Sequence, residues 1–286
     1  MKRIFSKILS LLGYKLSRVK HSDQISETVK KTLFNEMSVD EFLSSPENLN
    51  DYLINIYKSN VSYKFFTFPK YWKQAATCER YINNLRILDP SFSIEEGDVI
   101  IDAGAHHGIV SVHFASAGAR VYAFEPNPLN FAVLSYNSKV NGLTNLSAHC
   151  SALDSKTKNN APFNVGIRST TGSLASSGRE KLFSGQKINV KTVSLESVLV
   201  NEDLSTVRLL KVDTEGAEYR MLFELSERLL KKIQYICIEA HPTNSNSPVD
   251  MRNYLEQNNF VLNEFAALNG AVEYTCMNKS VAIYNL

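Results

Sequence analysis

The stretch VIIDAGAHHGIVSVHFA, residues 99–115, indicates the fold class most clearly. An apolar run ends in Asp102, a glycine, two histidines and Gly108, and apolar residues then return at helical spacing. A short apolar run predicts a buried strand, and the spacing that follows predicts a helix. A strand, a loop with glycines and a helix in this order are typical of a mostly parallel α/β sheet.

The alternation of strands and helices continues along the chain. Helices are expected over 106–118, from Asn127-Pro128 to Asn141-Gly142, over 217–232 and from Ser247-Pro248 onward. Strands are expected over 98–104, 120–126, 146–153, 208–216, 233–241, 259–265 and 279–286. Residues 158–166 and 186–194 are expected to form an extra hairpin, and the Ser/Gly-rich stretch between them, residues 167–180, a mobile loop. The part of this loop from Arg168 to Arg179 is expected either to close over the site or to be a disordered surface loop. We therefore expect a parallel sheet covered by helices on both faces.

The first 92 residues follow a different pattern. Residues 1–20 carry apolar side chains on one helical face and six cations before the first acid, Asp23. A basic amphipathic helix on an anionic membrane surface fits this pattern, and so does a helix that packs on the domain or on a partner. Residues 21–92 are expected to be mainly helical. The aromatic stretch around Trp72 predicts core packing or a wall for a ring-shaped substrate.

Composition excludes several classes of protein. The chain has 286 residues, 44% hydrophobic and 21% charged, with a net charge of +2, so it can bury a full core and favours no nucleic-acid partner. Its four cysteines form no C-x-x-C pair, which argues against zinc and disulfides and for a reducing, cytoplasmic compartment. No apolar run reaches the roughly 20 residues of a membrane span.

The loop after the first strand does not fit a phosphate-bearing ligand. Aligned on Gly104, a dinucleotide fingerprint requires glycine where this chain has His106 and Ile109. The second of the fingerprint's three glycines lets the backbone approach a pyrophosphate, and a histidine in its place obstructs that approach. The G-x-x-x-x-G-K-[ST] phosphate loop is also missing.

The loop does match acid-x-Gly-x-x-x-Gly, with Asp102, Gly104 and Gly108, and a second acid, Glu125, ends the next strand. An acid at that place can accept hydrogen bonds from both hydroxyls of a ribose. A cofactor with an adenosine, an amino acid end and no phosphate fits, and S-adenosylmethionine (SAM) is such a molecule. We expect Asp102 near its methionyl ammonium or the water around that group. Ser151, Ala152 and Leu153, after the third strand, are expected beside its adenine, with Asp154 as an acceptor for the exocyclic amine. NAD is the weaker alternative.

Four blocks, residues 99–115, 121–137, 209–219 and 236–242, together resemble the FkbM-type SAM-dependent methyltransferases. The resemblance implies a Rossmann-like class I methyltransferase domain over residues 93–286, with a seven-stranded sheet and O-methylation of sugars or polyketides. It implies SAM contacts for Asp102, Gly104, Gly108 and Glu125, and an active-site role for Asp213 and Glu215. His106 departs from the family, which usually has a small or amide residue there.

Acidic side chains gather at the ends of the fourth and fifth strands. Asp213 and Glu215 are two residues apart and point to the same side of an extended chain, as do Glu239 and His241. Asp213 or His241 is the expected general base, with Glu215 and Glu239 orienting the acceptor, whereas Glu218 fits a helix N-terminus. Such residues could also hold a divalent metal, but nothing in the sequence requires one, and none is assigned.

The function predicted on this basis is O-methylation, with SAM, of a hydroxyl on a small molecule or a glycan or glycolipid precursor at the inner membrane face. One alternative is a protein of methyltransferase fold that binds SAM or a nucleoside without turnover and serves glycan synthesis. A weaker alternative is an NAD-dependent sugar oxidoreductase. The acceptor and the oligomeric state are left open.

Overall fold

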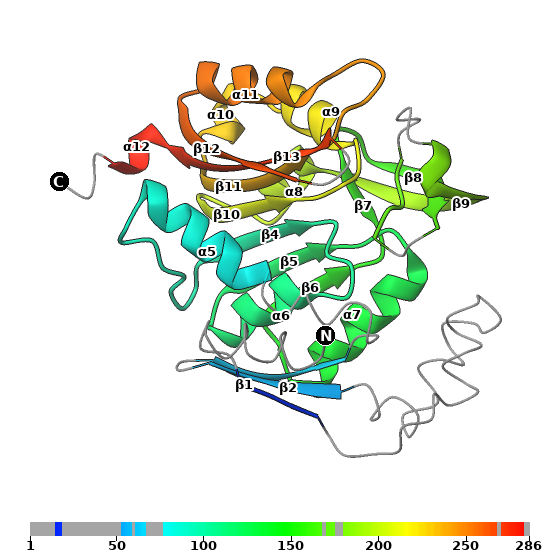
Figure 1. The fold of residues 1–286 in the computed structure, drawn as a ribbon, viewed down its shortest axis with the longest axis vertical. Coiled ribbons are helices and arrows are strands. Elements are labelled where there is room, and N and C mark those ends of the chain that lie inside the picture. The colour runs from blue at the N-terminus through cyan, green and yellow to red at the C-terminus, as the bar shows by residue number, and fades with distance from the viewer. Residues whose placement is uncertain are drawn as a thin grey trace.

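The computed structural model describes residues 15–18, 53–58, 61–66, 77–167, 170–174, 180–267 and 270–282. Its centre is a seven-stranded sheet with the strand order β12-β13-β11-β10-β4-β5-β6 (Figure 1). The strands are β4 (Val99–Ala103), β5 (Arg120–Phe124), β6 (Leu146–His149), β10 (Val207–Val212), β11 (Ile233–Ala240), β12 (Phe260–Ala266) and β13 (Val272–Asn278). The first five run parallel, and β13 lies antiparallel to both β11 and β12. The expected mostly parallel sheet is confirmed.

The strand order reverses between β4 and β10. From β4 the chain builds outward through β5 to β6, and it then returns to place β10 and β11 on the other side of β4. Ligands of open parallel sheets bind beyond the carboxyl ends of the strands at such a point. The register here pairs Asp102 of β4 with Lys211 of β10, which places the two residues side by side under the candidate loop.

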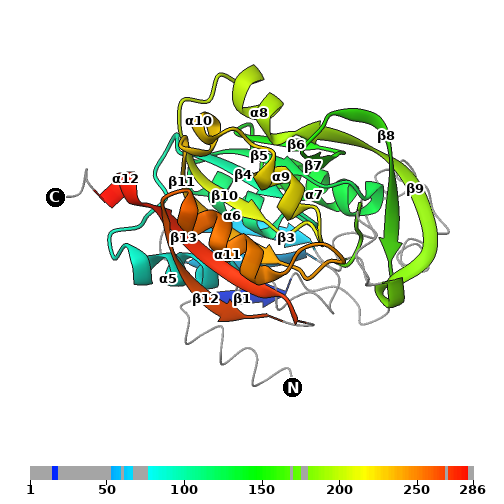
Figure 2. The same ribbon diagram turned by 90° about the horizontal axis from the view of Figure 1, so that it is seen from above.

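Helices cover both faces of the sheet (Figure 2). Alternate strand residues supply two cores: Ile100 packs into one and Ile101 into the other. The first core holds side chains of α5 (Thr77–Leu88), α6 (Ile109–Ser116) and α7 (Pro128–Val140). The second holds side chains of α8 (Leu195–Asn201), α9 (Glu218–Phe223), α10 (Glu227–Leu230) and α11 (Pro248–Gln257). The helix expected over 217–232 is interrupted between α9 and α10, where Ser226 is extended.

A second, three-stranded sheet lies beside the carboxyl ends of the main strands and has the order β7-β9-β8. It consists of β7 (Ala152–Asp154), β8 (Lys158–Gly166) and β9 (Phe183–Ser194), the last preceded by a 3-10 turn at Glu180–Leu182. The hairpin of β8 and β9 is confirmed. The strand expected over 146–153 is divided, because β6 stays in the main sheet while β7 pairs with β9.

Two other predictions about elements were wrong. Within the regions expected to be helical, β1 (Lys15–Arg18), β2 (Leu53–Lys58) and β3 (Val61–Phe66) form an antiparallel sheet. The period-two alternation of Val61, Tyr63 and Phe65 with more polar neighbours favours a strand. At the other end the last strand is β13, and part of the expected strand over 279–286 is the helix α12 (Lys279–Ala282). Trp72 and most of residues 1–20 lie outside the described residues.

Among the helices in the described part of the chain, none combines the length and the apolar character needed to cross a bilayer.

Candidate functional site

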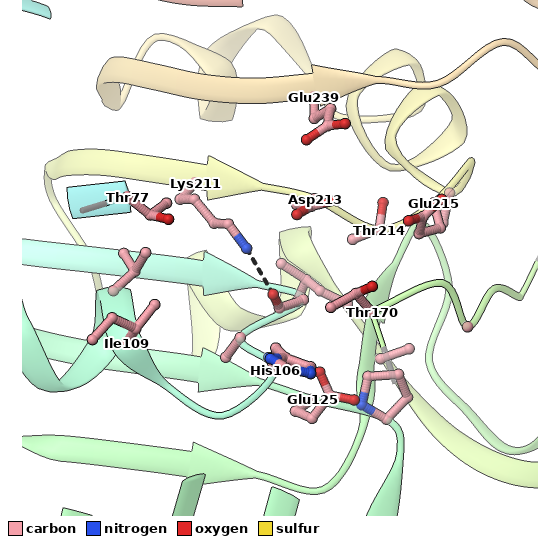
Figure 3. Close-up of a pocket in the computed structure, with 18 of the residues that line it drawn as sticks. Thr77, His106, Ile109, Glu125, Thr170, Lys211, Asp213, Thr214, Glu215 and Glu239 are labelled. Carbon is pink, nitrogen blue, oxygen red and sulfur yellow. Dashed lines mark hydrogen bonds between the residues drawn. The ribbon is translucent and has the colours of Figure 1, made fainter. Parts of the chain in front are cut away.

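A pocket lies at the carboxyl ends of β4, β5, β10 and β11. Figure 3 shows its two ends: Glu125 and His106 come from the loops after β5 and β4, while Asp213, Glu215 and Glu239 come from β10, β11 and their loops. The pocket is also lined by residues of α5 and of the segment 170–174. The segment expected to close over the site therefore lies at the pocket where it is described.

The loop after β4 is held against β10 at Gly104. Gly104 has a φ of 78°, in the left-handed region that favours glycine. A Cβ atom on this residue would lie 1.9 Å from the carbonyl oxygen of Asp213. Gly108 has a φ of 84° and precedes α6, but it does not line the pocket. Gly104 is therefore needed for a close approach of two backbone segments.

The loop carries two histidines and does not make a phosphate loop. His106 itself takes the left-handed conformation, with a φ of 53°, and its backbone N–H donates to Glu125 Oε2 at 2.8 Å. Its ring stacks on that of His107, with 3.7 Å between centroids, and His107 is buried. A β-carbon and a ring thus stand where a dinucleotide loop needs open backbone.

Glu125, at the same end of the pocket as His106, is held in place by three hydrogen bonds. Its Oε2 accepts from His106, and its Oε1 accepts from the backbone N–H of Asn127 at 2.9 Å and from Asn130 Nδ2 at 3.2 Å. Burial nevertheless raises the pKa of Glu125 to about 7. A bound group that donates further hydrogen bonds, or carries positive charge, favours the ionised carboxylate.

We expect SAM to bind more weakly as the pH falls below 7. In the free protein Glu125 gains a proton there, and a protonated carboxyl loses acceptor capacity toward a ribose. The affinity should reach its full value about one unit above pH 7 and fall by at most about tenfold for each pH unit below 7. Calorimetry one unit below and one unit above this pKa measures the change.

The Glu125→Ala variant is the control for this effect. It should bind SAM about 1–3 kcal/mol more weakly above pH 7, because ribose hydroxyls lose their acceptor. Its affinity should also lose the part of the pH dependence that Glu125 supplies. Equal affinity in the variant and the wild type would remove Glu125 from the site.

Asp102 lies behind the pocket wall rather than in it. Its side chain is fully buried, its Oδ2 accepts from Ser111 Oγ at 2.6 Å, and its Oδ1 is 3.2 Å from Lys211 Nζ. Lys211 lines the pocket and donates to the carbonyl oxygen of Gly104 at 2.6 Å, a bond dashed in Figure 3. The expected contact of Asp102 with a methionyl ammonium is therefore replaced by an ion pair with Lys211 that supports the loop.

Sequence reasoning missed the lysine, although a signal for it exists. Lys211 interrupts the apolar run LLKV, and a lysine inside a buried strand is rarely left without an acidic partner. Arg80 of α5 was also missed. It lines the pocket and pairs with the buried Glu273 at 2.9 Å.

The residues proposed for adenine divide between two places. Ala152 and Leu153 line the pocket. Asp154 is buried and bound to Arg220 Nε at 2.5 Å, so its carboxylate is already engaged.

Three carboxylates, Asp213, Glu215 and Glu239, line the opposite end of the pocket. Glu215 has a φ of 56°, and Ser173 Oγ donates to its carbonyl oxygen at 2.6 Å. Burial raises the pKa of Asp213, and Glu239 adds to this, against the lowering effect of Lys211. The ends of β10 and β11 thus bring together the acids that the sequence placed at two strand tips.

His241 lies just behind these acids and almost fully buried. Its Nε2 is 3.4 Å from Glu239 Oε1, 3.5 Å from Glu215 Oε2 and 4.0 Å from Asp213 Oδ1. Burial disfavours the charged imidazole, but hydrogen bonds to Glu218 and Glu239, together with the negative charges of Glu218 and Glu215, outweigh burial and raise the pKa of His241 well above its usual value. A protonated imidazole cannot accept a proton, so we do not assign His241 the role of general base.

Glu218 explains how His241 is held. The Glu218 carboxylate is fully buried and accepts from Gly216 N at 2.7 Å, Thr214 Oγ1 at 2.9 Å and His241 N at 2.8 Å. His241 Nδ1 is 3.1 Å from Glu218 Oε1. Glu218 is therefore a positioning residue, a role that a helix N-terminal acid alone does not predict.

Comparison with known proteins matches this part of the chain to one family. Residues 102–262 match the family model described as Methyltransferase FkbM domain. The hexuronic acid methyltransferase AglP of Haloferax volcanii is 27% identical over 154 residues, which are 51% of this chain and 57% of that protein, less than two thirds of its length. The 31-O-demethyl-FK506 methyltransferase FkbM of Streptomyces tacrolimicus is 24% identical over 174 residues, 52% of this chain and 67% of that protein.

Solved structures of other methyltransferases resemble the chain as well. The precorrin-6y C5,15-methyltransferase of Geobacter metallireducens covers 74% of this chain, and the match covers 92% of that protein, with 12% identity and a TM-score of 0.44. These values are too low to bear on function.

Proposed function

The chain belongs to the FkbM methyltransferase domain family, whose methyl donor is SAM, and from this premise we propose that it methylates a hydroxyl group of a sugar. The domain has the Rossmann-like class I methyltransferase fold. The proposal rests on one pocket, which has Glu125, an acid placed to bind a ribose, at one end and the carboxylates of Asp213, Glu215 and Glu239 at the other.

The charges that line the pocket suit SAM better than a phosphate-bearing cofactor. Four acids line it among the described residues, and the cations beside them are Arg80 and Lys211. Both cations have acidic partners, Glu273 and Asp102. A positively charged sulfonium is attracted to such a surface, whereas a pyrophosphate is repelled.

At the cofactor end of the pocket, side chains and backbone bind the cofactor and orient it. We assign ribose binding to Glu125, adenine contact to Ala152 and Leu153, and close backbone contact to Gly104 and His106. When SAM is bound, it supplies a methyl carbon that its sulfonium has already activated. The protein must then align the acceptor oxygen with that carbon and exclude water, and alignment can lower the barrier by about 7–11 kcal/mol.

At the acceptor end, the carboxylates take the proton. The acceptor O–H bond breaks and its proton passes to a carboxylate of the cluster Asp213, Glu215 and Glu239. Loss of the proton makes the acceptor oxygen a stronger nucleophile toward the methyl group that bound SAM would supply. General base assistance of this kind typically adds about 10²–10⁴-fold to the rate.

A sugar acceptor is supported by the relative AglP, which is named as a hexuronic acid methyltransferase. Sugars offer hydroxyl groups that need a base, and the carboxylate cluster provides one. A cytoplasmic location, and contact of residues 1–20 with a membrane, stay predictions from the sequence.

An acceptor assay tests the proposal. The purified protein is incubated with SAM carrying a deuterated methyl group and with free, glycan-linked and lipid-linked hexoses and hexuronic acids. We expect the label in a methyl ether on one of these sugars. Asp213→Asn should lower kcat by about 10²–10⁴-fold with little change in SAM affinity. The exposed Asp203→Asn is the control, with wild-type rates expected. Saturable SAM binding without label in any acceptor would favour the non-catalytic alternative.

A further inference from the structure

The acceptor end of the pocket contains a set of groups with the composition of a metal site. Asp213, Glu239 and His241 each offer one ligand atom, and these three atoms all lie within 4.8 Å of one another. His241 Nε2 is 3.4 Å from Glu239 Oε1 and 4.0 Å from Asp213 Oδ1. Metal–ligand distances of about 2.0–2.2 Å place neighbouring ligand atoms roughly 3–3.5 Å apart, so small side-chain movements complete the set.

The surroundings of His241 point to the same use. In a metal-bound histidine, the N–H of the other ring nitrogen almost always donates a hydrogen bond to a carboxylate or carbonyl, which fixes the orientation of the ring. Here Nδ1 meets the fully buried Glu218, and Glu218 is itself held by the backbone N–H groups of Gly216 and His241. Nε2 is thereby directed at the carboxylates of Asp213, Glu215 and Glu239.

The charge balance also favours a cation. Three carboxylates surround Nε2, and a protonated His241 offsets only one of their charges. The two pocket-lining cations, Lys211 and Arg80, pair with Asp102 and Glu273. A bound metal would take the place of the proton on Nε2. Two carboxylates and one imidazole suit a divalent first-row metal such as Mn²⁺ or Zn²⁺ better than Ca²⁺, which takes oxygen ligands alone.

We propose that Asp213, Glu239 and His241 bind one divalent cation, which holds the acceptor through two adjacent oxygens. This inference rests on the proposed function and makes it more specific. The cation polarises the hydroxyl that is methylated, and the carboxylate of Glu215, 3.5 Å from His241 Nε2, receives its proton. The acceptor class becomes a sugar with a vicinal diol, or with a hydroxyl beside a carboxylate, since such pairs of oxygens chelate a metal.

Binding of Mn²⁺ to the metal-free protein tests the site without methyl transfer. The protein is treated with EDTA, dialysed and titrated, and electron paramagnetic resonance measures the Mn²⁺ left free. We expect one equivalent to bind, and Glu239→Gln to weaken this binding at least tenfold. Glu224→Gln, a half-exposed acid outside the pocket, is the matched control and should bind as the wild type does. Asp213→Asn is a second variant, and SAM binding by each variant shows that it is folded.

The outcomes separate the two proposals. Methyl transfer that EDTA lowers at least tenfold and Mn²⁺ restores supports the metal site. Absence of Mn²⁺ binding, or equal binding by the wild type and Glu239→Gln, overturns the metal site. Methyl transfer that continues at the full rate in EDTA also overturns the metal site, but it leaves the proposed function standing. A wild-type protein that does not bind SAM would instead overturn the proposed function.

Discussion

Replacement of Lys211 by methionine should lower the free energy of unfolding by about 3–5 kcal/mol. The side chain of Asp102 is fully buried and that of Lys211 is 6% exposed, and the two form an ion pair. Removal of the ammonium leaves a buried carboxylate whose remaining hydrogen bond comes from Ser111. Urea unfolding, with the slope compared between variants, measures the loss.

The double variant Asp102→Asn/Lys211→Met is the control for this prediction. It removes both charges, while the amide oxygen that replaces the carboxylate still accepts from Ser111, so it should recover much of the stability lost by the single variant. A single variant that loses less than about 1 kcal/mol would mean that the pair is not the support under the loop.

Gly104→Ala should be the second severe change. The residue has a φ of 78°, and its new Cβ would lie 1.9 Å from the carbonyl oxygen of Asp213. The conformation costs about 1–2 kcal/mol and the overlap about 1–3 kcal/mol more. Because the overlap is with backbone, the loop and the end of β10 must separate, and SAM affinity should fall with stability.

Gly97→Ala separates the two costs. Gly97 has a φ of 83°, but a Cβ atom there meets nothing within 4 Å. It should therefore lose about 1–2 kcal/mol and keep its SAM affinity. Equal losses of stability in both variants would contradict the role given to close approach at Gly104.

Much of the main sheet could be predicted from the sequence because each parallel strand is an apolar run, and helix starts follow several of them. Asn127 shows this directly: its side chain accepts from Leu129 N and caps α7 as expected. The last strand was misplaced because residues 272–278 and 279–286 are both short and apolar in part. Strands β1 to β3 were missed because aromatic and polar residues there also fit a helical spacing.

The site was predictable to the extent that it depends on strand ends. Glu125, Asp213, Glu215 and Glu239 line one pocket because parallel strands bring their carboxyl ends to one edge. The burial of Asp102 depends on the register that pairs it with Lys211, which local pattern does not specify. The contact between Glu218 and His241 likewise joins residues 23 positions apart, at the ends of two different elements, so local pattern does not specify it either.

Calorimetry of the purified protein with SAM, S-adenosylhomocysteine and NAD shows whether this pocket takes a phosphate-free sulfur cofactor, of which SAM is the positively charged form. We expect saturable binding of SAM and its demethylated product, with no heat from NAD. Binding of NAD without binding of either sulfur compound would contradict this expectation.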